Sequence, residues 1–146
     1  MRQRRTLQRC QRELVDLQPY REGLDQHSIM GVTDARGRIT QVNTLFCRLT
    51  GYEHHELIGQ DHRILNSGHH PRAFFTEMWR TIAAGRVWRG EVCNRAKDGH
   101  LYWVDTTIVP SRHPRNGERR YISIRTDISE RKRMENALRL AAETDL

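Results

Sequence analysis

Two side chains with the chemistry of a ligand site, Trp88 and Asn94, lie at an even spacing in the sequence. On a regular strand, even spacing places both side chains on one face of a sheet. An indole offers a flat apolar surface and a carboxamide offers both a hydrogen-bond donor and an acceptor, which together suit a planar heteroaromatic ligand. Tryptophans in strands also pack in ordinary cores, and asparagines near turns also bond to backbone, and the spacing alone favours that structural interpretation.

Histidines and cysteines are the other side chains whose chemistry must be weighed. The adjacent pairs His54-His55 and His69-His70 lack a third ligand at a useful spacing, which favours solvated loop histidines over a metal site. Cys10, Cys47 and Cys93 are odd in number and widely spaced, which favours reduced structural thiols over disulfides or zinc binding. The sequence contains neither a phosphate-binding loop nor a nucleophile paired with a base, so we expect a chain that is not itself an enzyme.

The length and charge of the chain restrict its organisation and its partners. The 146 residues suffice for one domain with a buried core and flanking helices. The formal net charge of +7 comes almost entirely from arginines that are spread along the whole chain, so we expect no nucleic-acid binding. The sequence has no long apolar run and no signal-peptide pattern, which predicts a cytoplasmic chain without direct membrane insertion.

Alternating side chains and turn residues predict an antiparallel sheet. Strands are expected over 28–34, 38–43 and 121–126, and a hairpin is expected over 87–104, with its second strand continuing to residue 109. Asp98-Gly99 predicts a two-residue loop at positive φ in that hairpin. Strands precede and follow a block of helices, which predicts an α+β domain with helices on one face of the sheet.

The helices of the central block are predicted from capping residues and apolar spacing. Asn43 is expected to cap a helix over 44–49 that ends at Gly51, and a second short helix is expected over 53–58. The strongest helix is expected over 72–84. Its buried side should be formed by apolar residues at helical spacing: Phe74, Phe75, Met78, Trp79 and Ile82.

Both ends of the chain are predicted to be charged helices with a narrow apolar seam. In the first helix, the apolar spacing is that of a short coiled coil, and we expect a homodimer joined mainly by Leu7, Leu14 and Leu17. Asp127 and Glu130 form a capping-box pattern before the second helix. The seam of that helix is sparse and consists of Ile128, Met134, Leu138 and Ala141.

Taken together, these elements resemble the PAS family of sensor domains from Asp25 to about Arg131. The resemblance rests on strings that occur in the order typical of the family: GVTDARGRITQVN, FCRLTGY, ELIGQ, VWRGEVCNRAKDGHLYWVDTTIVP and YISIRTDISERK. It implies the PAS fold, with a five-stranded antiparallel sheet, helices on one face and coiled-coil-like flanking helices. The expected organisation is a dimerisation or linker helix over 1–24, a PAS sensor domain over 25–129 and a signalling helix over 130–146.

Within this family, the strings HRILNSGHHP, VWRG and NRAKDG are most similar to the flavin-binding PAS domains of aerotaxis transducers and nitrogen-fixation redox regulators. That resemblance implies a non-covalently bound FAD, with Trp88 packed on the isoalloxazine ring and Asn94 hydrogen-bonded to its pyrimidine edge. It further implies that the cofactor or its diphosphate is lined by Trp79, His62, Arg63 and Asn66. The aerotaxis pattern has a different basic cluster where Asn66-Ser67-Gly68 stands in this chain.

Residues 60–84 lack, at the positions where they are needed, the side chains that two other kinds of PAS ligand require. A photoreactive PAS domain needs a cysteine over the flavin, and 60–71 contains none. Haem needs an axial histidine, which haem-binding PAS sensors commonly carry on the long helix, and 72–84 contains none. Two other functions stay open: a ligand-free module for dimerisation and signal relay, with a pocket filled by its own side chains, and a small-metabolite sensor that uses Arg63, Asn66 and Asn94.

The mechanism that the flavin resemblance implies is a redox switch. Reduction of a flavin exchanges a hydrogen-bond donor and acceptor on the ring, so Asn94 must rotate or lose its partner. We expect the change to pass through the sheet to Asp127, Ile128 and Glu130 and on through the following helix. Residues 142–146 resemble the lead-in to diguanylate cyclase domains, which implies an output domain in the same chain that synthesises cyclic di-GMP.

Overall fold

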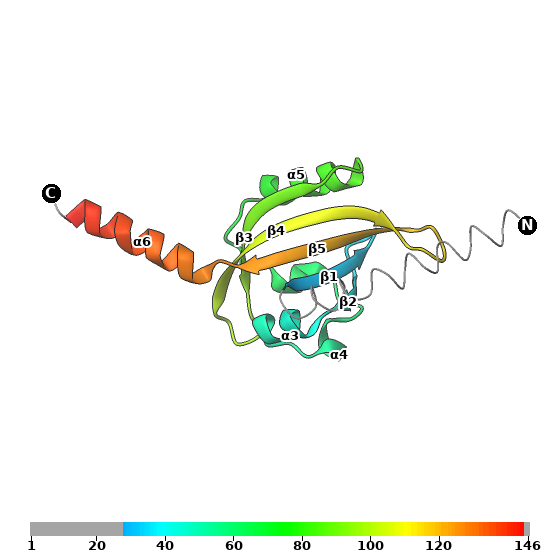
Figure 1. Ribbon diagram of the computed structural model, residues 1–146, viewed down its shortest axis with the longest axis horizontal. Coiled ribbons are helices and arrows are strands. Elements are labelled where there is room, and N and C mark those ends of the chain that lie inside the picture. Colours follow the sequence, from blue (N-terminus) through cyan, green and yellow to red (C-terminus); the bar gives the residue numbers. More distant parts are fainter. Residues whose placement is uncertain (1–27, 145–146) are drawn as a thin grey trace, which may run out of the picture.

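The computed structural model describes residues 28–144, in which five strands form an antiparallel sheet in the order β2-β1-β5-β4-β3 (Figure 1). The predicted sheet is therefore confirmed. The predicted N-terminal helix, with Leu7, Leu14 and Leu17, lies outside the described residues. The strands are β1 Ile29–Asp34, β2 Ile39–Val42, β3 Trp88–Arg95, β4 Leu101–Arg112 and β5 Arg119–Asp127.

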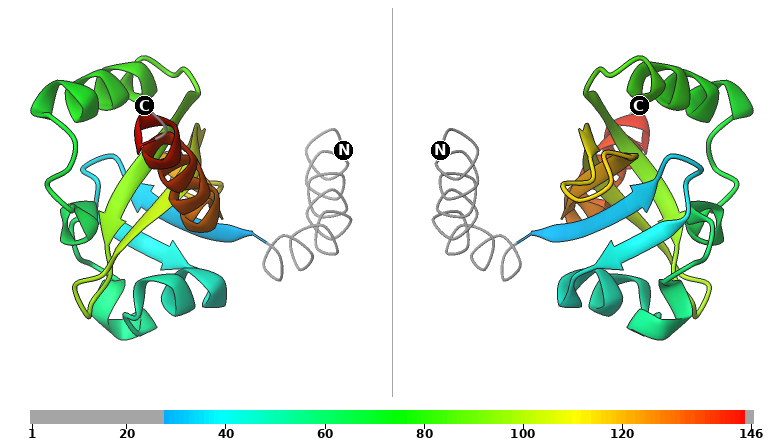
Figure 2. Two further views of the ribbon diagram at one scale, coloured as in Figure 1. Left: turned by 90° about the vertical axis from the view of Figure 1, so that its left-hand side faces the viewer. Right: turned by 90° about the vertical axis from the view of Figure 1, so that its right-hand side faces the viewer.

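The helices between β2 and β3 gather on one side of the sheet, and the last helix continues from the end of β5 away from the domain (Figures 1 and 2). The predicted α+β arrangement is thus confirmed. The helical elements are α3 Thr44–Thr50, α4 His54–Leu57, the 3₁₀ turn η1 His62–Leu65, α5 Arg72–Ala83 and α6 Ser129–Thr144.

Strand register decides which side chains face the helices. Trp88 is paired with Ile108, Asn94 with Tyr102, and Thr106 with Arg125. The face covered by α5, here called the inner face, therefore carries the even-numbered residues of β3 and β4 and the odd-numbered residues of β5. The prediction that Trp88 and Asn94 share one face is confirmed.

The core consists of two clusters on the inner face. Beneath α5, the predicted apolar side of this helix packs on β3, β4 and β5, with Met78 and Ile82 buried and Phe74, Phe75 and Trp79 partly buried. The second cluster joins α3, α4 and η1 to β1 and β2 through Ile29, Ile39, Phe46, Leu57 and Leu65. The cavity described below lies at the border of these clusters, because its walls draw residues from both.

Asn43 has the predicted capping role and also connects α3 to β1. Its Oδ1 accepts hydrogen bonds from the backbone N–H of Phe46 and of Met30, each at 3.1 Å, and its Nδ2 donates to the carbonyl of Ser28 at 2.6 Å. Gly51 ends the helix in the left-handed region at φ +77°, as predicted.

The loop between β3 and β4 differs from the prediction. The N–H of Ala96 donates to the carbonyl of His100 at 2.9 Å, so three residues rather than two turn the chain. Gly99 has a positive φ of 95°, whereas Asp98 does not. The Asp98 carboxylate accepts the N–H of His100 at 3.0 Å, and this local bond stabilises the alternative turn.

The strand ends also differ from the prediction. β4 extends beyond residue 109 because Arg112 pairs with Arg119 at the start of β5, a long-range contact that alternation alone does not reveal. The helix α6 begins at Ser129, and the Asp127 carboxylate accepts the Ser129 N–H at 3.0 Å rather than the Glu130 N–H that the predicted capping box requires. Within 28–144, each helix is too short or too polar to cross a membrane.

Candidate functional site

A cavity of about 60 Å³ lies between α5 and the inner face of the sheet. Its lining is mostly apolar, and the polar side chains that reach it include His62, Asn94 and Arg125. Ligand pockets usually have volumes of about 300 Å³ or more, whereas one water occupies about 30 Å³. This inner cavity therefore has room for water but not for an organic ligand of ordinary size.

A larger outer cleft of about 700 Å³ adjoins the inner cavity and shares four wall residues with it: His62, Phe75, Trp79 and Asn94. Its volume is within the usual range for small-molecule sites. Arg36 and Arg72 contribute guanidinium groups to the lining, and the Arg63 guanidinium donates to both oxygens of the Asp61 carboxylate, which lines the same cleft. Guanidinium groups match phosphate oxygens in geometry and charge, so the outer cleft is suited to an anionic ligand group.

The structure places every predicted cofactor residue around these two hollows. Trp79, His62 and Asn94 line both, Arg63 and Asn66 line the outer cleft, and Trp88 lines the inner cavity. Sequence reasoning missed several other lining residues: Arg36, Arg72, Phe75 and Arg125. Arg125 has no local signal, because alternation in β5 makes Ile122 and Ile124 the more apolar set, and only the register of β5 with β4 places Arg125 on the inner face.

Trp88 is a core residue as well as a wall of the cavity. Its side chain is buried, and its ring meets that of Phe74 edge-on at 5.5 Å. The indole lies over Gly90, where an added Cβ would come within 2.5 Å of Cη2. Trp88 therefore packs in the core, as its position in a strand favours, and it also lines the predicted site.

Asn94 is held near the edge of the sheet by the segment that precedes α5. Asn66 forms a β-bridge with Asn94. Next to this bridge, the Ser67 hydroxyl donates to the Cys93 carbonyl at 2.7 Å, and the Cys93 N–H donates to His70 Nε2 at 2.8 Å. These bonds satisfy backbone groups that an edge strand would otherwise leave open, so they fix β3 at the position where Asn94 faces inward.

Four buried polar atoms lack a hydrogen-bond partner within 28–144, and three of them lie near this site: His62 Nδ1, Tyr102 Oη and Arg125 Nε. The fourth, Arg120 Nε, lies on the opposite face of β5. His62 Nδ1 lies 3.1 Å from Asp61 Oδ1 without the geometry of a hydrogen bond, and burial lowers the pKa of this histidine. Burial raises the pKa of Tyr102 to about 12. His62 is therefore neutral and Tyr102 protonated at pH 7. Unsatisfied buried atoms of this kind are rare in native proteins and indicate a missing partner.

Histidine pairs and cysteines do not combine into a metal site in the described part of the chain, where no group of three or more potential ligands is suitably placed. His69 and His70 instead belong to an aromatic cluster, in which His70 stacks on Phe74 at 4.1 Å and His69 meets Trp103 edge-on at 5.0 Å. Cys93 is buried beside this cluster.

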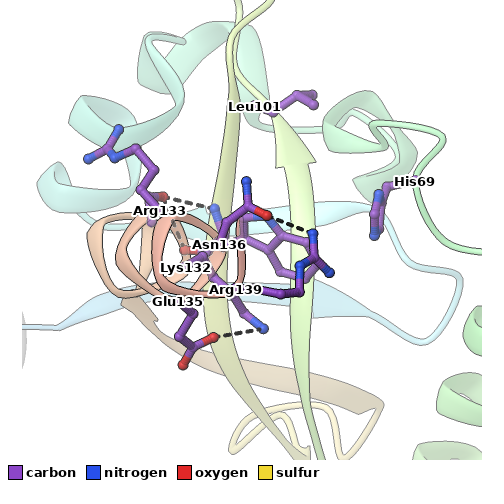
Figure 3. Close-up of a pocket in the computed structure, with 9 residues that line it drawn as sticks. His69, Leu101, Lys132, Arg133, Glu135, Asn136 and Arg139 are labelled. Carbon is purple, nitrogen blue, oxygen red and sulfur yellow. Dashed lines mark hydrogen bonds and ion pairs between the residues drawn. The ribbon is translucent and has the colours of Figure 1, made fainter. Parts of the chain in front are cut away.

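A third hollow, of about 650 Å³, lies where α6 meets the outer side of β4 (Figure 3). The Lys132 ammonium lies 4.8 Å from the centre of the Trp103 ring and 2.5 Å from Glu91 Oε1, and Arg131 pairs with the same carboxylate. Ser129 Oγ accepts the Trp103 N–H at 2.9 Å. These contacts attach the first turn of α6 to β3 and β4.

The predicted relay residues lie beside this attachment but differ in their contacts. Ile128 is buried, and its N–H donates to the Trp103 carbonyl at 2.9 Å. Asp127 accepts the Ser129 N–H, whereas Glu130 is exposed. Sequence reasoning missed Glu91 and Trp103, because their contacts with α6 join segments that are distant in the sequence.

Comparisons with known proteins agree with this architecture. The chain is similar to a nitrogen fixation regulatory protein of Klebsiella pneumoniae, with 40% identity over 117 residues, which are 80% of this chain and 24% of that protein. It is also similar to the aerotaxis receptor of Escherichia coli K12, with 40% identity over 103 residues, which are 70% of this chain and 20% of that receptor. The chain thus spans a quarter or less of the length of these relatives.

Solved structures with the same fold include an RNA-binding light-oxygen-voltage receptor, with a TM-score of 0.71, 24% identity and coverage of 90% of this chain and 38% of that one. A PAS domain from Colwellia psychrerythraea has a TM-score of 0.68 and 25% identity, with coverage of 78% of this chain and 98% of that one. Residues 26–130 match the model of the PAS domain family. By its sequence, its sheet and its helical arrangement, the chain belongs to the PAS domain family.

Proposed function

We propose that this chain is a sensory domain that binds FAD and relays redox or oxygen state to an output domain. The observation that supports the proposal most directly is the gathering of Trp88, Asn94, Trp79, His62, Arg63 and Asn66 around two adjoining hollows. The flavin resemblance named these residues from the sequence, and strands, loops and α5 bring them together.

The donor set is chemically suited to a flavin with a diphosphate. Asn94 offers a donor and an acceptor to a heteroaromatic edge, Trp79 offers a ring face, and the arginines of the outer cleft suit phosphate oxygens. The inner cavity is smaller than a tricyclic ring, so a ring that contacts Trp88 must displace side chains between α5 and the sheet. Binding is therefore expected to shift α5 relative to β3.

A bound flavin supplies reversible electron transfer coupled to a change in protonation. The chain contributes the Asn94 carboxamide, which can present either its donor or its acceptor to the ring, and the Trp88 indole, which excludes water. An unmet buried hydrogen bond costs about 1–3 kcal/mol, enough to shift a two-state packing of the sheet against its helices.

The same strand offers a route to α6. Glu91 of β3 pairs with Lys132 and Arg131, so a displacement of β3 at Asn94 changes the attachment of the helix. In the proposed relay, Asp127, Ile128 and Glu130 transmit this change toward an output domain. We further propose that the sensor acts in the cytoplasm as a homodimer through its flanking helices, with cyclic di-GMP synthesis as the output.

The decisive experiment is a visible absorption spectrum of the purified chain before and after reconstitution with FAD. Saturable flavin bands in the parent chain, weakened at least tenfold in affinity by Asn94→Ala and by Trp88→Ala, are the expected result. Asn116→Ala is the matched control, because this asparagine lies in an exposed turn and lines neither hollow. A parent chain that stays colourless with FAD would refute the proposal.

The small inner cavity gives one alternative a specific basis. A ligand-free module for dimerisation and relay has a pocket filled by its own side chains, and Trp88 and Phe75 border a space of only about 60 Å³. A colourless protein that is nevertheless dimeric, and whose mass in solution falls on disruption of its flanking helices, would support this second function.

A further inference from the structure

Arg125 is a partly buried cation that has no counter-ion among residues 28–144. It lies on β5 opposite Thr106, faces inward and lines the inner cavity. Its Nε atom is buried without a hydrogen-bond partner, and no carboxylate forms an ion pair with it within residues 28–144. Burial lowers its pKa, which reflects the free-energy penalty of holding this charge away from water.

The surroundings of Arg125 compensate only part of that penalty. The guanidinium carbon lies 5.1 Å from the centre of the Phe46 ring, a favourable cation–π contact. The other titratable groups that respond to its charge are Tyr102 and His62, and neither carries a negative charge at pH 7. A guanidinium has several donors and no acceptor, so only an acceptor or an anion can complete its bonding.

From this geometry we infer that Arg125 binds the buried end of the ligand through an acceptor-rich, negatively polarised group. The inference rests on the proposed function, because FAD is taken as the ligand. The pyrimidine edge of a flavin carries carbonyl oxygens, and uptake of two electrons and one proton leaves the ring with one negative charge. Arg125 therefore stabilises the reduced ring relative to the oxidised ring and raises its midpoint potential.

The first test is the midpoint potential of the flavin-bound chain, titrated with dithionite as the reductant. In Arg125→Gln, the equilibrium constant for reduction of the bound flavin should fall about tenfold. For a two-electron couple this lowers the midpoint potential by about 30 mV. Arg125→Lys should retain most of the parent potential because it keeps the charge. Arg89→Gln, which removes an exposed charge on β3, is the control and should leave the potential unchanged.

The second test needs no ligand, because it measures urea unfolding of the flavin-free chain. Removing an uncompensated, partly buried charge should raise the unfolding midpoint of Arg125→Gln above that of the parent, whereas loss of a structural arginine would lower it. A flavin-bound parent with an unchanged potential in Arg125→Gln would overturn the inference and leave the FAD proposal standing. A parent that binds no flavin would refute the FAD proposal, and a lowered unfolding midpoint would then overturn the ligand-binding role of Arg125 as well.

Discussion

Glu91 and Asn94 occupy the same strand but face opposite sides of the sheet. Asn94 lines the inner cavity and the outer cleft, whereas Glu91 pairs with Lys132 on α6 at 2.5 Å. Because the two residues are three positions apart on one strand, we expect a displacement of β3 at Asn94 to reach Glu91. The candidate ligand site and the helix that leaves the domain are thus connected through one segment of β3.

Glu91→Gln should loosen the first turn of α6 while the domain stays folded. The carboxylate accepts hydrogen bonds from Lys132 and Arg131, which lower its pKa, and the amide removes the charge from both pairs. The carboxylate is partly exposed, so the loss of stability should stay below about 1 kcal/mol. Hydrogen exchange of the α6 amides should become several-fold faster. Glu77→Gln, at an exposed site on α5, is the control, and equal exchange in both variants would contradict the proposed attachment.

Gly90→Ala should destabilise the domain because its Cβ would lie 2.5 Å from the Trp88 indole. Displacing a packed indole costs about 1–3 kcal/mol in the free energy of unfolding, measurable by urea denaturation. In a Trp88→Leu background the same substitution should cost much less, because the shorter side chain leaves room for the Cβ. An equal cost in both backgrounds would show that the indole does not lie over Gly90.

The sequence predicts the elements well where a local bond decides the structure. Asn43 caps the start of α3 with its side chain, and Gly51 ends the helix with a left-handed backbone. Both roles follow from the residue type and can be predicted from the sequence. Asp98 shows the limit of this reasoning, because its carboxylate bonds to the His100 N–H and produces a longer loop than the Asp-Gly pair predicts. Competing local bonds of similar strength cannot be ranked from residue types.

The candidate site was predictable only in part, because its walls depend on register and on contacts between distant segments. The even spacing of Trp88 and Asn94 predicts their common face, and this is confirmed. The contact between Glu91 and Lys132 has no local signal, since it depends on the direction in which α6 leaves β5. Arg125 faces inward only because β5 pairs with Thr106 of β4 in one register.

Asn43→Ala should destabilise the domain by about 2 kcal/mol, at the upper end of the range for a lost helix cap. The expected effect is large because the same carboxamide also bonds to β1, through the N–H of Met30 and the carbonyl of Ser28. Chemical denaturation measures the change. Asn116→Ala removes a carboxamide that accepts only a local turn bond and should cost less than about 0.5 kcal/mol. Similar losses for the two variants would refute the connecting role of Asn43.

The proposed homodimer can be tested at both flanking helices. Leu138 and Met134 are largely exposed on α6 at coiled-coil spacing, so they are available to a second copy of the chain. The double variant Leu14→Asp and Leu138→Asp should have half the mass of the parent by light scattering. Its PAS domain should remain folded, with the secondary structure of the parent by circular dichroism. Arg133→Asp, also exposed on α6, is the control for added negative charge. An unchanged mass in the double variant would rule out these seams as the dimer interface.

Acidification should weaken the contact between His70 and β3. His70 Nε2 accepts the Cys93 N–H at 2.8 Å, which requires an unprotonated nitrogen, and burial lowers the pKa of His70 below its ordinary value of 6.5. The unfolded chain therefore binds more protons than the folded chain as the pH falls through 6.5, so stability is complete above that pH and declines below it. The pKa of His62 is lowered in the same way, so this residue adds to the decline.

His70→Gln, which keeps an acceptor but does not titrate, should show a smaller fall in melting temperature between pH 7 and about pH 5 than the parent chain. The exposed His54→Gln variant should behave like the parent, and an equal fall in His70→Gln would exclude His70 as a source of the pH dependence.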